Sequence, residues 1–152
     1  MKLQTATRLA LYAALDLAAE PERQMSVGEI AEKYGVSTNH LAKVLRELGR
    51  AKLVEAARGV GGGYRFAGNA KRVTLMDVVG LFEDVHAGPL ESTERGRPSA
   101  VASALGLVLA EIEATTVATL SSITLDTMLK LMRRHAAAPA PTVTAGTVRA
   151  AE

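Results

Sequence analysis

The chain has 152 residues, 48% of them hydrophobic, and a formal net charge of +2, which suits one domain with an ordinary core. It contains no cysteine, which excludes disulfides, thiolate catalysis and cysteine-ligated zinc or iron-sulfur sites on this chain. No continuous run of 18 apolar residues occurs, and the N-terminal stretch carries Lys2, Arg8 and Asp16, so we expect no membrane span, no export signal and a cytoplasmic location.

The charge is unevenly distributed. Between Lys33 and Arg72, nine basic residues accompany only Glu47 and Glu55, a net charge of +7, whereas the stretch from Glu83 to the C-terminus has a net charge of −2. This concentration is the electrostatic footprint of a polyanion-binding protein. The alternative is an ordinary solvated surface.

Two helices are predicted before residue 35. The first covers Thr5 to Glu20, which is rich in alanine and leucine and is followed by Pro21. Ser26 and Glu29 have the spacing of a capping box, in which each side chain accepts a hydrogen bond from the other residue's amide. A short second helix is therefore expected to run from there to Tyr34.

A third helix follows a tight turn. Gly35 can adopt the left-handed conformation that ends the second helix, and Ser37 can cap a helix that runs to about Arg50. Two short helices joined in this way are typical of a helix-turn-helix.

One face of the third helix is apolar and consists of Leu41, Val44, Leu45 and Leu48. The opposite face carries Asn39, Lys43, Arg46 and Arg50. Such a face suits the major groove of DNA, where Asn pairs with adenine and cations pair with guanine or phosphate; the alternative is a solubilising surface helix.

The sequence RGVGGGYRF occupies residues 58–66. A dinucleotide-binding loop would need a glycine where Tyr64 stands, and a Walker loop would need Gly-Lys-Ser or Gly-Lys-Thr. The flanking runs LVEAA and YRFA favour a β-hairpin whose glycine tip carries Arg58 and Arg65. Three helices followed by a hairpin are the order of a winged helix, in which the glycines let the tip turn tightly and approach DNA.

The C-terminal half contains three more predicted helices. Thr74 and Asp77 form a second capping box that opens a helix to about Phe82. Residues 99–120 form a long helix, and Thr124 caps a last helix. One stripe of the long helix needs cover and is predicted to form a dimer interface: Val101, Leu105, Val108, Ile112, Thr115 and Thr119. The alternative is burial within a single subunit.

The predicted fold class is therefore mainly α with a small β-hairpin. We expect a winged helix-turn-helix DNA-binding domain over residues 1–82 and a linker loop over 83–98. The dimerisation helix and the C-terminal helix would cover 99–135, and a disordered tail 136–152.

These segments resemble the Rrf2-type bacterial transcription regulators across residues 1–131. The resemblance lies in MKL, ALYAALDLA, IAEKYGVSTNHLAKVLREL, LVEAARGVGGGYRF, VTLMDVVGLFE and LSSITLDTML, and the third helix is most similar to the nitric-oxide-sensing branch. It implies a homodimeric repressor on a palindromic promoter site. Together with the helix-face analysis it gives these DNA-binding residues: Thr38, Asn39, His40, Lys43, Arg46, Arg50, Arg58, Gly61, Gly62, Tyr64 and Arg65.

The sequence departs from the family pattern at the sensing region. Cluster-binding members carry three cysteines in the region that corresponds to residues 83–103, and some supply a carboxylate ligand where this chain has Arg8. We therefore expect no cofactor, and an effector, if one exists, would be a small ligand or a partner protein acting on that region. His86 lies near Glu83, Asp84 and Glu91 in the sequence and is interpreted as solvated surface rather than a metal ligand.

No catalytic motif competes with this interpretation. The chain has no G-x-S-x-G and no H-E-x-x-H, so an enzyme is not expected. The sequence predicts a sequence-specific regulator that binds double-stranded DNA. The alternatives are a winged-helix module for protein contacts and a nucleic-acid-associated protein without a regulatory role.

Overall fold

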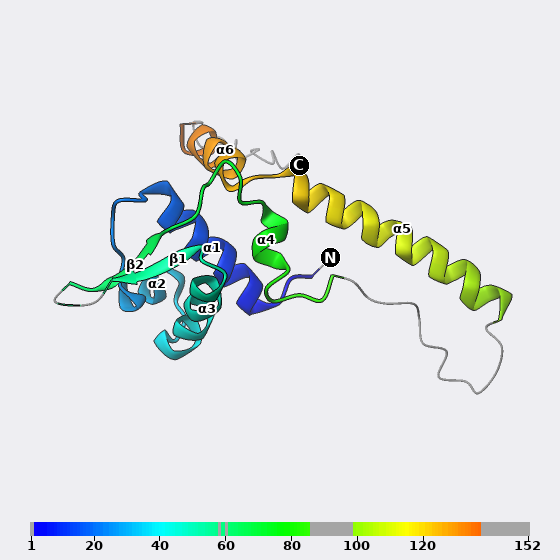
Figure 1. The fold of residues 1–152 in the computed structure, drawn as a ribbon, viewed down its shortest axis with the longest axis horizontal. Helices are drawn as coiled ribbons and strands as arrows, with labels where there is room; N and C mark the ends of the chain where they lie inside the picture. Colours follow the sequence, from blue (N-terminus) through cyan, green and yellow to red (C-terminus); the bar gives the residue numbers. More distant parts are fainter. Residues whose placement is uncertain (1, 58, 60, 86–98, 138–152) are drawn as a thin grey trace, which may run out of the picture.

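The computed structural model describes residues 2–57, 59, 61–85 and 99–137 (Figure 1). Its elements are α1 (Thr5–Ala19), α2 (Val27–Tyr34), α3 (Thr38–Arg50), β1 (Val54–Ala57), β2 (Gly63–Phe66), α4 (Leu75–Val79), α5 (Ala100–Ser122) and α6 (Leu125–Ala137). β1 and β2 pair in antiparallel register, with Val54 opposite Phe66 and Ala57 opposite Gly63. The predicted fold class, mainly α with a small hairpin, is confirmed.

Side-chain caps set where the helices begin. The Thr74 hydroxyl accepts from the Asp77 amide at 3.2 Å, and the Asp77 carboxylate accepts from the Thr74 amide at 2.7 Å, so this predicted capping box is complete. At α2, the Ser26 hydroxyl accepts from the Glu29 amide at 3.1 Å. The Glu29 carboxylate pairs with Arg23 instead of accepting from the Ser26 amide, so only the serine half of the capping box predicted at Ser26 and Glu29 forms.

Two helix ends differ from the predictions. α4 ends at Val79 rather than near Phe82, because the hydrogen bonds after Gly80 change to the tighter i to i−3 pattern. The Leu81 amide donates to the Val78 carbonyl at 3.3 Å, and the Phe82 amide donates to the Val79 carbonyl at 3.0 Å. α6 continues to Ala137, two residues into the segment predicted to be a tail. The reason is local, since alanine has the highest helix propensity of the residues.

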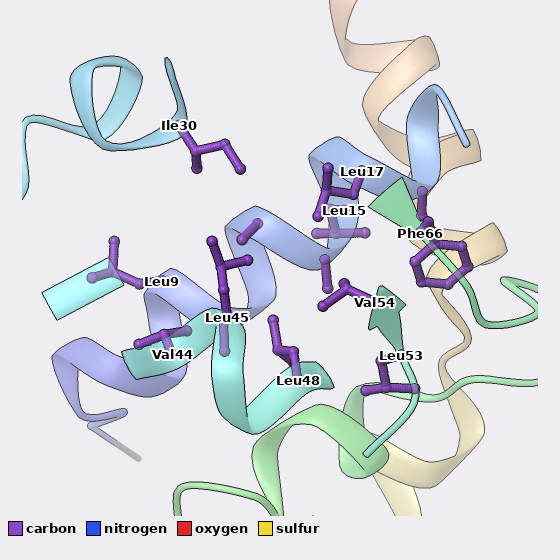
Figure 2. Close-up of a cluster of buried hydrophobic side chains, with 14 of the residues drawn as sticks. Leu9, Leu15, Leu17, Ile30, Val44, Leu45, Leu48, Leu53, Val54 and Phe66 are labelled. Atoms are coloured by element: carbon purple, nitrogen blue, oxygen red, sulfur yellow. The ribbon is translucent and has the colours of Figure 1, made fainter. Parts of the chain in front are cut away.

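The core is built around α1. Figure 2 shows Leu9, Leu15 and Leu17 of α1 in one cluster with the apolar side chains of α3 and with the hairpin residues Val54 and Phe66. The buried side chains of α3 are the four that its periodicity predicted: Leu41, Val44, Leu45 and Leu48. Since α1 and the hairpin cover this face, the polar face of α3 is directed away from the core.

A third extended segment joins the hairpin. The Met25 amide donates to the Tyr64 carbonyl at 2.9 Å, and the Tyr64 amide donates to the Met25 carbonyl at 2.8 Å. A Cβ on Gly63 would lie 2.5 Å from the Met25 carbonyl oxygen, so this glycine is needed for the strand to approach. Gly59 and Gly61 instead have φ of 113° and 80° and allow the turn. The wing glycines therefore serve the turn and the docking of the hairpin onto the domain.

α5 is attached to the domain at its C-terminal end. The Leu75 amide donates to the Ile123 carbonyl and the Leu125 amide to the Val73 carbonyl, both at 2.8 Å. Leu125 and Leu129 of α6 are buried in the core, whereas α5 has no buried residue. In Figure 1, α5 extends away from the body formed by the other helices.

Candidate nucleic-acid interface

α3 presents a polar, cationic face. Ser37 caps the helix by accepting from the His40 amide at 3.2 Å. The predicted contact residues of this helix are all exposed: Thr38, Asn39, His40, Lys43, Arg46 and Arg50. The face thus combines one amide, one imidazole and three permanent cations, a set that can donate to base edges and to phosphate oxygens.

The wing supplies the second part of the site. Arg65 and Gly61 are exposed, and Gly62 and Tyr64 are half-buried. Tyr64 also packs against the core, so it has a structural role beside any contact with DNA. Arg58 lies outside the described residues.

Both carboxylates of the basic segment are engaged with cations of the predicted site. Glu47 pairs with Arg50 at 2.8 Å, and Glu55 pairs with Arg65 across the hairpin. The four side chains are between 43% and 69% exposed, so each pair contributes little to stability and a phosphate can displace the carboxylate. In the described part of the chain, Lys43 and Arg46 form no ion pair.

A groove of about 670 Å³ runs between α3 and the hairpin. Three cationic residues line it, namely Arg46, Arg50 and Lys52, together with the carboxylate of Glu55. Lys52 was not among the predicted contacts, because it lies beyond the last turn of α3 and belongs to no helix face. Its only sequence signal was its share of the net charge between residues 33 and 72.

Glu83 fastens the start of the predicted linker to α1. Its carboxylate accepts from the Gln4 amide at 2.7 Å, from the Thr7 hydroxyl at 2.5 Å and from the Gln4 side chain at 3.2 Å. The Thr7 hydrogen bond is the largest of the causes that lower the pKa of Glu83, followed by the Gln4 amide. The charged form of Glu83 therefore stabilises the contact between the N-terminal turn and the linker.

Replacing Glu83 with Gln is expected to reduce the acid sensitivity of the fold. Because its folded-state pKa lies below the ordinary value, Glu83 contributes stability that is present at neutral pH and is lost as the pH falls through that pKa. The Gln variant should melt at a lower temperature than the wild type at pH 7, and the difference should shrink at pH 4. The hydrogen bond from Lys130 lowers the pKa of Asp126, so Asp126 makes a second acid-dependent contribution to stability in both the wild type and the Gln variant. A constant difference in melting temperature between pH 7 and pH 4 would contradict this role.

No metal site is formed by the residues described. Within 2–57, 59, 61–85 and 99–137, no three His, Asp or Glu side chains are placed to hold an ion together. His86 and Glu91 lie outside these ranges.

α5 is long and apolar enough to cross a membrane by length and composition alone. The sequence predicted no span, because it contains no continuous run of 18 apolar residues. Glu111 and Glu113 lie near its middle, where a bilayer would make ionised carboxylates costly. Packing of α5 against other protein surfaces explains its apolar residues better than insertion into a membrane does.

Three helices, a hairpin bridged by a third extended segment, and a cationic outer face on the third helix define a winged helix-turn-helix protein of the DNA-binding kind. The family model Rrf2, described as an iron-dependent transcriptional regulator, matches residues 3–131. The chain therefore belongs to the Rrf2 family, and it is a DNA-binding transcriptional regulator rather than an enzyme.

Relatives and solved structures agree with this assignment. The chain is 50% identical over 132 residues to a protein of Rhodopseudomonas palustris that carries the name HTH-type transcriptional regulator BadM, covering 87% of this chain and 83% of that protein. The structure of CymR, the global cysteine regulator of B. subtilis, has 26% identity and a TM-score of 0.71, with 86% of this chain and 98% of that chain covered. T. potens IscR has 29% identity and a TM-score of 0.68, with 91% and 93% covered.

The iron in the family's description does not fit the residues of this chain. Cysteine is absent from all 152 residues, and the described region gathers no alternative set of three ligands. Thiolates are the usual ligands of iron-sulfur clusters. This chain therefore lacks the ligands of an ordinary iron-sulfur site.

Proposed function

We propose that the protein is a cytoplasmic homodimeric repressor that binds a palindromic promoter site. The observation that carries the proposal is the exposed face of α3, where an amide and three cations lie beside a wing with a further exposed arginine. A repressor needs only to occupy its DNA site, and the exposed cationic face of α3 supports such a role.

The proposed division of labour follows from side-chain chemistry. Asn39 and Lys43 are exposed in the N-terminal half of α3, the part of a recognition helix that contacts base edges, and would read them in the major groove. Arg46, Arg50 and the wing residues would position the domain on the phosphates. Thr38 and His40 in the first turn of α3, with Gly61, Gly62 and Tyr64 in the wing, complete the proposed contacts.

The proposed dimer interface is the stripe on α5. Val101, Leu105, Val108 and Ile112 are large apolar side chains that remain exposed, which is unusual for a contiguous set on one helix face. The Thr119 hydroxyl donates to the Thr115 carbonyl at 2.8 Å. This threonine can therefore enter an apolar interface with its hydroxyl satisfied. A twofold arrangement would place two α3 helices about 34 Å apart on one face of the duplex.

A duplex-binding titration combined with sedimentation tests the proposal. If about six phosphates are neutralised, the logarithm of affinity should fall with a slope near −5 against the logarithm of salt concentration. Sedimentation should give twice the mass of the chain. A monomer would contradict the dimer, and an affinity that is independent of salt would favour the alternative of a winged-helix module for protein contacts. Genome-wide footprinting then identifies the operator.

We further propose that this regulator works without a cluster, so any signal would act through a small ligand or a partner protein on residues 83–103. The absence of cysteine supports this, because no thiolate is available to hold or to lose iron. Iron analysis and an absorption spectrum after anaerobic purification test it. Stoichiometric iron with visible absorption bands would contradict it.

A further inference from the structure

Lys52 has a backbone conformation that L-residues rarely adopt. Its φ is 58°, and among the described residues other than glycine it is the only one with a positive φ. Lys52 lies just beyond the last residue of α3, where the helix ends. The Leu53 amide donates to the Leu48 carbonyl and the Lys52 amide to the Gly49 carbonyl, both at 3.0 Å. These two bonds are the Schellman pattern that ends a helix, with Lys52 at the left-handed position.

Glycine is the usual residue at that position, because a Cβ makes the left-handed conformation costly. α2 follows the rule, since Gly35 with φ of 62° ends it. At the end of α3 the chain has a lysine instead. A strained residue that the fold retains points to a role beyond the fold. A lysine near a helix C-terminus also interacts favourably with the helix dipole, so the two roles have to be separated by experiment.

The surroundings of Lys52 indicate what that role is. Lys52 lies on the wall of the groove between α3 and the hairpin, with Arg46 and Arg50 on the same groove. The carboxylate on the groove, Glu55, is engaged by Arg65, and Glu47 is engaged by Arg50. Lys52 and Arg46 form no ion pair within the described ranges. The groove therefore has a net positive charge and lies between the two proposed DNA-contacting elements.

We propose that this groove seats the phosphodiester backbone of one DNA strand and that Lys52 contacts a phosphate there. The inference rests on the proposed function. A helix in the major groove and a wing at the adjoining minor groove must have a strand of backbone between them, and the groove lies between α3 and the hairpin. Its lysine and arginines are the side chains that bind phosphate oxygens.

Two neutral variants and one charged control test the role of Lys52. Lys52→Gly and Lys52→Asn both accept the left-handed conformation, and Lys52→Arg keeps the charge. The probe is a fluorescein-labelled 30-bp duplex of random sequence at low salt, because a phosphate contact is independent of sequence. Both neutral variants should bind this duplex more weakly, by about threefold to tenfold, with a salt slope shallower by about one per bound protomer. Lys52→Arg should bind as the wild type does.

The melting temperature separates this role from a role at the helix end. If Lys52 serves DNA, Lys52→Gly should raise the melting temperature, by about 2 to 4 °C, while it weakens binding. Unchanged affinity and salt slope in both neutral variants would overturn the proposal, and a lowered melting temperature with unchanged affinity would assign Lys52 to the helix end. If the wild type itself does not bind the duplex, the proposed function fails. If the wild type binds and both neutral variants bind equally well, only the inference about Lys52 fails.

Discussion

Replacing Val108 with Asp is expected to convert the protein to a monomer and to reduce its affinity for a palindromic operator by about 100-fold or more. Val108 lies in the α5 stripe and is 57% exposed in the single chain, so the substitution does not disturb the core. In the proposed dimer each protomer would bury an aspartate carboxylate in an apolar interface, which is strongly unfavourable. Once the dimer is lost, the two half-sites no longer bind cooperatively. Sedimentation and operator titration measure both effects.

Ala110→Asp is the matched control for this experiment. Ala110 is exposed on the same helix but lies about 200° around it from Val108, so it is off the stripe. An aspartate costs more helix propensity at Ala110 than at Val108, because alanine is the best helix former and valine ranks close to aspartate, so the control is the more demanding of the two. The control should remain a dimer with wild-type affinity. A dimeric Val108→Asp variant would show that α5 is covered in some other way.

Replacing Asn39 or Lys43 with Ala should cost about 1 to 3 kcal/mol on the cognate site and relax base preference at the contacted positions. Both side chains are exposed on α3, and the loss of a base contact leaves the nonspecific phosphate contacts in place. Titration of cognate and random duplexes at one salt concentration measures the difference. The loss should be much smaller on the random duplex.

Arg65→Ala provides the comparison. Arg65 is a wing cation without a neighbouring base-reading group in the proposal, so its removal should weaken cognate and random duplexes by similar factors. The exception is a wing that reads a narrow A·T minor groove, in which case the loss depends on the sequence of the flanks. Equal losses on the two duplexes for Asn39→Ala and Lys43→Ala would refute the assignment of these residues to base reading.

Local chemistry explains which parts of the fold were predictable. Ser26, Ser37 and Thr74 were predicted as caps, because a cap depends only on a side chain and an amide three residues away. The buried face of α3 followed from its period of 3.6 residues. The end of α3 was also placed correctly, but its left-handed Lys52 was not foreseen, since the usual glycine signal is absent there.

Contacts between distant segments were not predictable. The Met25 bridge to Tyr64 and the Glu83 contacts with Gln4 and Thr7 join residues 39 or more positions apart, and no local pattern marks such partners. For the site, the sequence indicated the cationic face of α3, but not that Arg50 and Arg65 are paired with carboxylates. Those pairs depend on rotamers and register that only the folded chain determines.

The attachment of α5 gives it the mechanics of a lever. Its C-terminal end is fixed by the main-chain bonds at Ile123 and Leu125, and its 23 residues extend about 35 Å from that fulcrum. A rotation of about 2° at the fulcrum would move the opposite end by about 1 Å over this length. Residue 99, where the chain from the DNA-binding domain joins, lies at the end with the longest moment arm. A small force applied there would have the greatest mechanical advantage over the angle at which two protomers meet.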